Sequence, residues 1–262
     1  MRSNIIAICN QKGGVGKTTT AINLAAALAA TGKKILIIDL DPQGNASTGL
    51  GIDYVDRNKS IYEVLAKSIT FDESVKKTDI ENLFVIPSNV ELSGIEPELA
   101  NESDKAFVLK KLINNSNSIN VFDYIFIDCP PALSLLTVMA MTAANSVLVP
   151  LQCEFFALEG LSQLIKTVDR VHKNLNPLLS IDGIILTMFD KRNKLSTQVA
   201  MDVKKHLQEK VFETMIPRNV RVSEAPSFGM PVIIYDRKSK GSQAYLKLAA
   251  EILKKDKSRE AA

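Results

Sequence analysis

The sequence has little of the material from which metal centres and disulfide frameworks are built. Only three cysteines and two histidines occur among its 262 residues. Cys9, Cys129 and Cys153 are widely spaced, and each lies within or beside an apolar run, which favours reduced, buried thiols in a cytosolic protein. His172 and His206 stand alone without the spacing of metal ligands, so we expect both at the surface.

Long apolar runs are also missing. No stretch approaches the ~20 apolar residues that a membrane-spanning helix needs, and the apolar run near the N-terminus is too short for a signal peptide. Hydrophobic residues make up 46% of the chain and charged residues 23%, the balance of an ordinary globular protein. We therefore expect a single cytoplasmic domain, 1–262, that is long enough to bury a substantial core.

Charge is distributed unevenly along the chain. Residues 186–262 contain 16 Lys and Arg against 9 Asp and Glu, a net charge of +7, whereas the whole chain carries +3. This basic C-terminal third is consistent with the lysine-rich surface helices of any soluble protein, or with a face that binds a polyanion. After about residue 255 we expect a short flexible tail.

Apolar strand-like segments alternate with helical ones, which predicts an α/β fold: a doubly wound, mostly parallel sheet flanked by helices. In such a sheet, ligands bind beyond the carboxyl ends of the strands. The expected strands are 5–9, 34–40, 83–87, 122–129, 146–151, 181–188 and 232–235. The expected helices are 18–30, 61–67, 96–114, 135–144, 158–173, 197–210 and 243–253.

The segment 12–19 reads K-G-G-V-G-K-T-T and indicates a phosphate-binding loop. Its glycines let backbone N–H groups turn toward phosphate oxygens, and the helix that follows offers the positive end of its dipole. Lys17 is placed to reach the β- and γ-phosphates, and Thr18 to bind Mg²⁺. One nucleotide needs only one such lysine from the loop that binds it. Lys12 is a second, which suggests that it contacts a phosphate bound to another subunit.

Two acidic segments follow later strands. Asp39 and Asp41 lie in the run D-L-D-P-Q-G-N, and Asp128 ends the apolar strand Y-I-F-I-D. An aspartate at the end of a strand is typical of the Walker B acid of nucleotide-hydrolysing proteins. Taken singly, these features are also consistent with a glycine turn and two solvated acids. Their occurrence together at strand ends favours an ATPase or a GTPase.

These motifs resemble those of the ParA/MinD ATPases, a P-loop NTPase family with a deviant Walker A loop, and look like the chromosomal ParA (Soj) branch. The resemblance extends from about residue 5 to residue 253, without a departure in the nucleotide motifs. It implies that the protein binds ATP and Mg²⁺. The segments that carry it are 12–19, 39–45, 124–131, E-F-F-A-L-E-G at 154–160 and P-R-N-V-R-V-S-E-A-P at 217–226.

The resemblance also implies roles for individual residues. Lys12 would cross an ATP-bound homodimer to the partner's nucleotide, and Asp41 would orient the attacking water, although a place beside the Mg²⁺ ligands is also open to it. With Lys17, these are the candidate catalytic residues. The candidates for binding the phosphates are Lys12, Gly13, Gly14, Val15, Gly16, Lys17, Thr18 and Thr19, and those for binding adenine are Pro217 and Asn219. The candidates for binding Mg²⁺ are Thr18, Asp39 and Asp128. The candidates for contacting DNA are Arg192, Arg218 and Arg221.

The predicted function is an ATP-dependent dimerising switch for DNA partitioning at the nucleoid. The ATP-bound homodimer would bind DNA non-specifically, since no helix-turn-helix segment precedes the loop, and a ParB/Spo0J-type partner would release it by stimulating hydrolysis. One alternative is a MinD-like membrane-associated regulator of division, but the tail lacks the apolar face that this needs, and no membrane partner is expected. Another is an iron–sulfur electron carrier, which needs exposed cysteines.

Overall fold

The computed structural model describes residues 3–260, which contain one seven-stranded sheet in the order β3-β4-β2-β5-β1-β6-β7. All neighbouring strands are parallel except β3 and β4. The strands are β1 Asn4–Ile8, β2 Ile35–Asp39, β3 Lys76–Lys77, β4 Leu83–Ile86, β5 Tyr124–Asp128, β6 Ser146–Gln152 and β7 Ser180–Thr187. The helices are α1 Lys17–Ala29, α2 Asn45–Gly49, α3 Ile61–Leu65, α4 Phe71–Ser74, α5 Ile95–Glu98, α6 Val108–Asn114, α7 Leu135–Ala143, α8 Ala157–Asn174, α9 Lys194–Leu207, α10 Val220–Glu224, α11 Val232–Tyr235 and α12 Lys240–Glu260.

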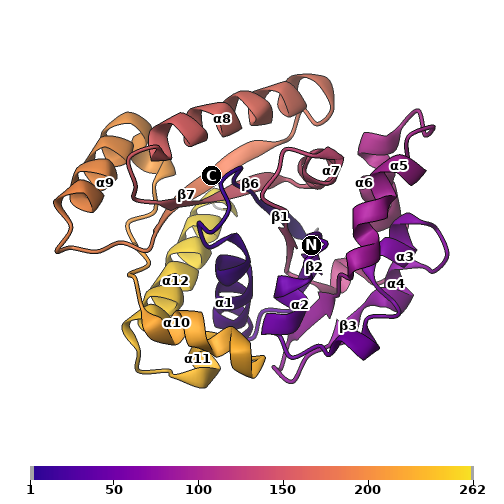
Figure 1. Ribbon diagram of the computed structural model, residues 1–262, viewed down its shortest axis with the longest axis horizontal. Coiled ribbons are helices and arrows are strands. Elements are labelled where there is room, and N and C mark those ends of the chain that lie inside the picture. Colours follow the sequence, from indigo (N-terminus) through magenta and orange to yellow (C-terminus); the bar gives the residue numbers. More distant parts are fainter. Residues whose placement is uncertain (1–2, 261–262) are drawn as a thin grey trace.

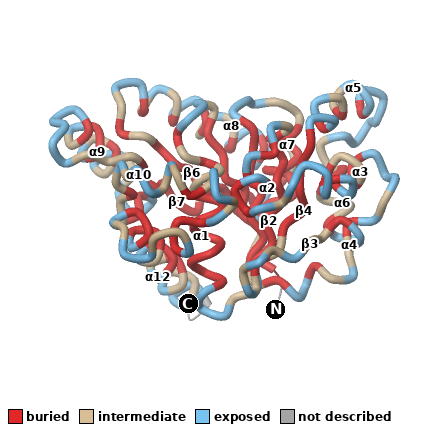
Figure 2. The backbone as a smooth tube through the Cα atoms, turned by 60° about the horizontal axis from the view of Figure 1, so that its bottom comes forward, coloured by how far each residue is buried: buried red, intermediate tan, exposed pale blue. Residues whose placement is uncertain are grey.

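Helices cover both faces of the sheet, as the alternating sequence predicts. In β5, Ile125 and Ile127 pack into the hydrophobic cluster formed with α3 to α9, whereas Tyr124 and Phe126 pack into the cluster formed with α1, α2, α11 and α12 (Figure 1). Because both sides are buried, the strands are apolar at nearly every position. Figure 2 shows the buried sheet at the centre and the exposed loops around it. The doubly wound parallel fold is confirmed.

The predicted strand at 232–235 is wrong, because these residues form the short helix α11. Val232 and Ile233 are buried against α1 and α12, so their β-branched side chains find an apolar contact without joining the sheet. The backbone N–H of Val232 donates to Asn23 Oδ1 on α1 at 2.6 Å, which fixes the start of this turn. The short strand β3 was not predicted, since two lysines carry no apolar pattern.

Two helical predictions differ in extent. The expected helix 96–114 is divided into α5 and α6, because polar residues around Asn101–Asp104 form turns between them. The expected flexible tail after about residue 255 is helical as far as Glu260, since α12 is held at its end by neighbouring strands. Arg259 pairs with Asp182 at 2.7 Å, and the hydroxyl of Tyr124 donates to Asp256 at 2.6 Å.

The cysteines and α12 bear on the two alternative functions. Cys9, Cys129 and Cys153 are free and at most 5% exposed, which agrees with reduced, buried thiols and leaves none at the surface for a shared cluster. The apolar side of α12, including Tyr245 and Leu248, is buried against the sheet and α1, so it is not available to a membrane surface. Within residues 3–260 no helix combines the length and the apolar character that crossing a membrane requires.

Gly183 of β7 is expected to be essential for the packing of Phe212. A Cβ atom at Gly183 would overlap the Phe212 ring, so Gly183→Ala should lower the free energy of unfolding by about 1–3 kcal/mol. Gly160 of α8 is the control, because nothing lies within 4 Å of a Cβ there and Ala is favoured over Gly in a helix by about 0.5–1 kcal/mol. Urea denaturation measures both, and unchanged stability of Gly183→Ala would contradict the packing.

Candidate functional site

The three segments singled out in the sequence meet at one edge of the sheet. Strand β5 lies between β2 and β1, and its last residue, Asp128, is in register with Asp39 on one side and with Ile8 on the other. The glycine loop follows β1, so it begins beside both carboxylates. This is the edge at the carboxyl ends of the parallel strands, where open α/β sheets bind ligands.

The loop has the backbone of an anion-binding turn. Gly14 and Gly16 have φ angles of 74° and 89°, which glycine adopts without strain. Gly16 stands at the N-cap of α1 and provides no side-chain cap, so the first N–H groups of this helix are available to a ligand. The hydroxyl of Thr187, at the end of β7, donates to the Val15 carbonyl at 2.8 Å and holds the loop from its other side.

Lys17 is the buried cation of the site. It is only 7% exposed, and its Nζ donates to the Lys12 carbonyl at 3.2 Å. Burial lowers the pKa of Lys17, whereas the negative charges of Asp128 and Asp41 act in the opposite direction. Its ammonium has therefore lost the stabilisation that water would provide, and it reaches across the loop to the Lys12 carbonyl. A negatively charged phosphate bound in the loop would stabilise this buried positive charge.

Asp39, Asp41 and Asp128 are all buried beside it. Asp39 accepts hydrogen bonds from the backbone N–H and the hydroxyl of Ser47 at 2.8 and 2.6 Å, yet burial raises its pKa to about 6. Burial, and then the charge of Asp39, raises the pKa of Asp128 well above its usual range. Asp41 accepts from the Gln43 N–H at 3.0 Å. Adjacent buried carboxylates favour a bound cation.

The donor set fits a magnesium ion that is shared with a phosphate. Both oxygens of Asp128 are fully buried with no donor in good hydrogen-bonding geometry among the described residues, although the neighbouring Thr18 hydroxyl acts to lower the pKa of this carboxyl. No group of three or more His, Cys, Asp and Glu within residues 3–260 is arranged to hold a metal by itself. Mg²⁺ needs no such cage, because it is usually bound by one or two carboxylates together with substrate phosphates and water. Thr18, Asp39 and Asp128 provide oxygens of this kind.

Residues 217–219 reach the same edge from the C-terminal third. Pro217 pairs with Phe189 just beyond β7, and the Arg218 N–H donates to the Phe189 carbonyl at 3.2 Å. Asn219 caps α10, since its Oδ1 accepts from the Arg221 N–H at 3.0 Å. Both candidate adenine residues therefore lie at the carboxyl ends of the strands, near the loop that Thr187 holds.

Lys12, in contrast to Lys17, is exposed. Its ammonium forms an ion pair with Glu154, and the two side chains are 45% and 46% exposed. Glu154 also accepts from the Gln152 side chain at the end of β6. The second lysine of the loop is thus at the surface, in the same chain as its carboxylate partner.

The three candidate DNA-binding arginines are exposed, and two are already paired. Arg192 binds Asp190 through two hydrogen bonds of 3.0 and 3.1 Å. The hydrogen bonds from Arg192 are the main cause that lowers the pKa of Asp190 to about 2, and the charge of Arg218 adds a smaller contribution. Arg221 pairs with Glu224 at 2.9 Å and with Asp236 at 3.5 Å. Arg192 and Arg218 both act on Asp190, so these two arginines lie near each other just beyond β7.

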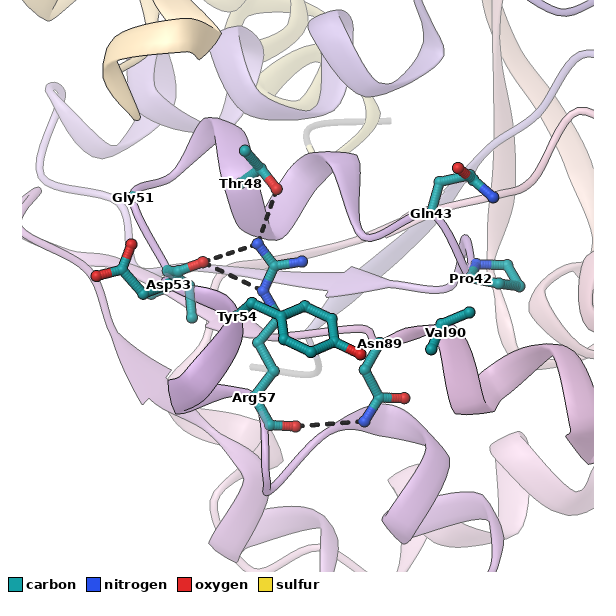
Figure 3. Close-up of a pocket in the computed structure, with 10 residues that line it drawn as sticks. Pro42, Gln43, Thr48, Gly51, Asp53, Tyr54, Arg57, Asn89 and Val90 are labelled. Atoms are coloured by element: carbon teal, nitrogen blue, oxygen red, sulfur yellow. Dashed lines mark hydrogen bonds between the residues drawn. The ribbon is translucent and has the colours of Figure 1, made fainter.

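Three residues at the site escaped the sequence analysis. Ser47 holds Asp39, Glu154 holds Lys12, and Arg57 contacts the loop that follows Asp41. Glu154 begins the family segment 154–160, and Ser47 lies two residues after the segment 39–45. These neighbouring motifs were the only features of the sequence that could have pointed to either residue. Arg57 lies in a stretch without any motif, and Figure 3 draws its hydrogen bonds with Thr48 and Asn89.

Comparison with known sequences gives matches over nearly the whole chain. A sequence profile of the AAA domain matches residues 3–181. The chain is 54% identical over 257 residues to the chromosome partitioning protein ParA of Caulobacter vibrioides NA1000, covering 98% of this chain and 96% of that protein. It is 51% identical over 248 residues to the sporulation initiation inhibitor protein Soj of Bacillus subtilis, covering 95% and 97%.

Solved structures show the same fold at lower identity. A cobyrinic acid a,c-diamide synthase from Mycobacterium smegmatis, with bound ADP and magnesium, superimposes with a TM-score of 0.85 at 35% identity, covering 98% of this chain and 96% of that one. The septum site-determining protein MinD of Pyrococcus horikoshii, complexed with Mg-ADP, gives 0.78 at 30% identity, covering 95% and 96%. Both neighbours hold an adenine nucleotide and magnesium.

Removing the charge of Asp128 should stabilise the ligand-free protein. Asp128→Asn eliminates a buried carboxylate with no donor in good hydrogen-bonding geometry among the described residues, so the unfolding free energy should rise by about 1–3 kcal/mol. A raised pKa means that the folded protein binds the proton more tightly than the unfolded chain does. The cost of the native aspartate therefore grows as the pH rises above its unfolded value, and the gain should be larger at pH 8 than at pH 5.

Asp182→Asn is the matched control. Asp182 is equally a buried aspartate, but it pairs with Arg259 at 2.7 Å and with Lys255 at 3.4 Å, so its loss should lower stability. Calorimetric melting at both pH values measures the two variants. Destabilisation of equal size by both substitutions would show that Asp128 is not an uncompensated charge.

Proposed function

Because the chain belongs to the ParA/Soj family of chromosome-partitioning ATPases, we propose that it is an ATP-dependent dimerising switch for DNA partitioning. The ATP-bound homodimer binds DNA without sequence specificity. A ParB/Spo0J-type partner stimulates hydrolysis and so releases the dimer. The protein acts in the cytoplasm, at the nucleoid.

The observation that carries this proposal is the separation of two lysines of one loop. Lys17 is buried beside Asp128 and Asp41, where it serves the nucleotide of its own subunit. Lys12 is half-exposed at the surface, where a second subunit can present a phosphate. An exposed ion pair of this kind is worth only about 0–1 kcal/mol, so exchange of Glu154 for a phosphate is energetically easy.

The other site residues follow from this arrangement. The loop from Gly13 to Thr19 binds the phosphates, and Pro217 and Asn219 contact the adenine. Thr18, Asp39 and Asp128 hold Mg²⁺, which neutralises phosphate charge when it is bound. Asp41, fixed by the Gln43 N–H, orients the attacking water for hydrolysis to ADP and phosphate. Phosphoryl transfer needs little more than this positioning and charge neutralisation.

The arginines of the C-terminal third supply the DNA contact. Arg192 is 91% exposed and Arg221 53% exposed, and their acidic partners can be exchanged for DNA phosphates at small cost. Arg218 is exposed and makes no ion pair within residues 3–260. Such phosphate contacts bind any sequence and weaken steeply with salt.

DNA binding should require both ATP and Lys12. Fluorescence anisotropy with a labelled duplex, across a salt series, should show tight binding with ATP, and weak binding with ADP or without nucleotide. Lys12→Ala should lose the ATP-dependent binding because its dimer lacks the cation contributed from the partner. Equal binding in all nucleotide states would exclude the switch.

The double variant Arg218→Glu/Arg221→Glu is the control for this experiment. It should lose DNA binding but keep nucleotide affinity within about twofold, since neither residue contacts the buried phosphate centre, and surface charge changes act mainly locally. Size-exclusion chromatography with ATP should still show its dimer. Retention of DNA affinity by this variant would place the DNA contact elsewhere.

Asp41→Ala should abolish most hydrolysis and leave nucleotide binding intact. Loss of a group that positions a reacting water or proton typically costs about 10²–10⁴-fold in rate. Phosphate release measures the rate, and a fluorescent ATP analogue measures affinity. Asp53→Ala is the control, because Asp53 is an exposed acid after the same loop. Hydrolysis by Asp41→Ala at the wild-type rate would exclude the proposed role.

A further inference from the structure

Arg57 is a buried charged side chain whose guanidinium donates its hydrogen bonds to neutral groups, while the negative charges of Asp39 and Asp53 act on it from beyond ion-pair distance. It is only 6% exposed, and within residues 3–260 it forms no ion pair. Its guanidinium donates to the Ile52 carbonyl at 2.8 and 3.1 Å and to the Thr48 hydroxyl at 2.7 Å. Figure 3 shows it between Thr48 and the Tyr54 ring. Burying a charge is costly, and these hydrogen bonds offset part of that cost.

One of the contacts fixes the turn that begins at Asp41. Arg57 Nη1 donates to the Gly44 carbonyl at 3.1 Å, and the Gly44 N–H donates back to the Asp41 carbonyl at 2.9 Å. Gly44 has a φ of 62°, and a Cβ atom there would overlap Arg57 Nη1. The guanidinium of Arg57 therefore occupies the space that a side chain at position 44 would need, so the two residues depend on each other.

A second route connects Arg57 to Asp39. Gly44 is the N-cap of α2, and Ser47 on this helix donates twice to Asp39. The Ser47 hydroxyl also accepts from the Ser88 N–H at 3.0 Å, and the Ser88 carbonyl lies 3.5 Å from Arg57 Nη1. The guanidinium thus holds α2 at Gly44 and Thr48, and the segment after β4 at Ser88.

We propose that Arg57 is a positioning residue for the carboxylates of Asp39 and Asp41 during ATP hydrolysis, and that position 44 must be glycine to leave room for the guanidinium. The inference rests on the ATPase function proposed above. Arg57 makes no hydrogen bond to either carboxylate; it holds them through Gly44, Ser47 and Ser88, and its positive charge also acts on Asp39. It belongs to the segment between β2 and β4, which the sequence left without a role.

Arg57→Met should separate catalysis from nucleotide binding. The loop at 12–19 makes no contact with Arg57 among its hydrogen bonds, so the dissociation constant for ATP should stay within about threefold. The hydrolysis rate kcat should fall by about 10–100-fold, because displacements near 1 Å at a catalytic group cost that much. Arg57→Lys should not restore it, since one ammonium cannot replace a fork that reaches three carbonyls and a hydroxyl.

Gly44→Ala tests the same pair of residues without removing the arginine. It should lower kcat as Arg57→Met does, because the added methyl group displaces the guanidinium. Gly32→Ala is the matched control: Gly32 also has a positive φ, of 86°, but nothing lies within 4 Å of a Cβ there. It carries the same backbone strain far from the loop, so its kcat should equal that of the wild type. The double variant Gly44→Ala/Arg57→Met should be no slower than the worse single variant.

The results are read from phosphate release, ATP affinity and melting temperature together. A fall in kcat for Arg57→Met and Gly44→Ala, with ATP affinity retained in protein that is folded at the assay temperature, supports the inference. Equal loss of affinity and rate, or wild-type kcat in either variant, overturns it. If Arg57→Met does not fold, Thr48→Val, which removes one acceptor from an exposed residue, must still lower kcat. Failure of the wild-type protein to hydrolyse ATP would instead overturn the proposed function, and this inference with it.

Discussion

The structure depends on the parallel register of β2, β5 and β1. This register places Asp39 and Asp128 side by side at the ends of adjacent strands, both fully buried, with the glycine loop directly beyond β1. Two neighbouring carboxylates in an apolar core are unfavourable by themselves, as the raised pKa of each shows. The apolar clusters on both faces of the sheet stabilise the fold despite this cost. A cation that binds with a phosphate removes the cost, so ligand binding and stability are linked.

Much of this arrangement could be predicted from the sequence, because it depends on local signals. Buried parallel strands are apolar at nearly every position, and the glycine loop is defined by backbone geometry within a few residues. The segment 232–235 was assigned wrongly, since β-branched residues also suit a short helix packed on α1. Arg57 could not be found at all. Its partners lie between 5 and 31 residues away in the sequence, and only the folded chain brings them together.

The count of charges in the C-terminal third is a poor guide to how many cations are free. Arg192 and Arg221 each have an acidic partner on the same surface, and Lys204 pairs with Glu213 at 2.8 Å. Exposed pairs contribute little to stability and exchange readily, so they do not prevent contact with a polyanion. They do prevent the isolated subunit from presenting an unbroken positive surface. A dimer that places two such surfaces together gains more from a polyanion than either subunit alone.

The same reasoning applies to Lys12 and limits what Glu154 can do. The half-exposed pair between them is too weak to block dimerisation, because its loss costs no more than about 1 kcal/mol. Any timing of the switch must therefore come from the phosphate that Lys12 would meet in a second subunit. In the proposed dimer, that phosphate would be held by the buried centre of the second subunit, the counterpart of Lys17, Asp39 and Asp128 in the described chain. In the proposed dimer, the surface contact of Lys12 would therefore form only when the second subunit holds a nucleotide in its own buried site, so nucleotide binding and dimerisation would be coupled.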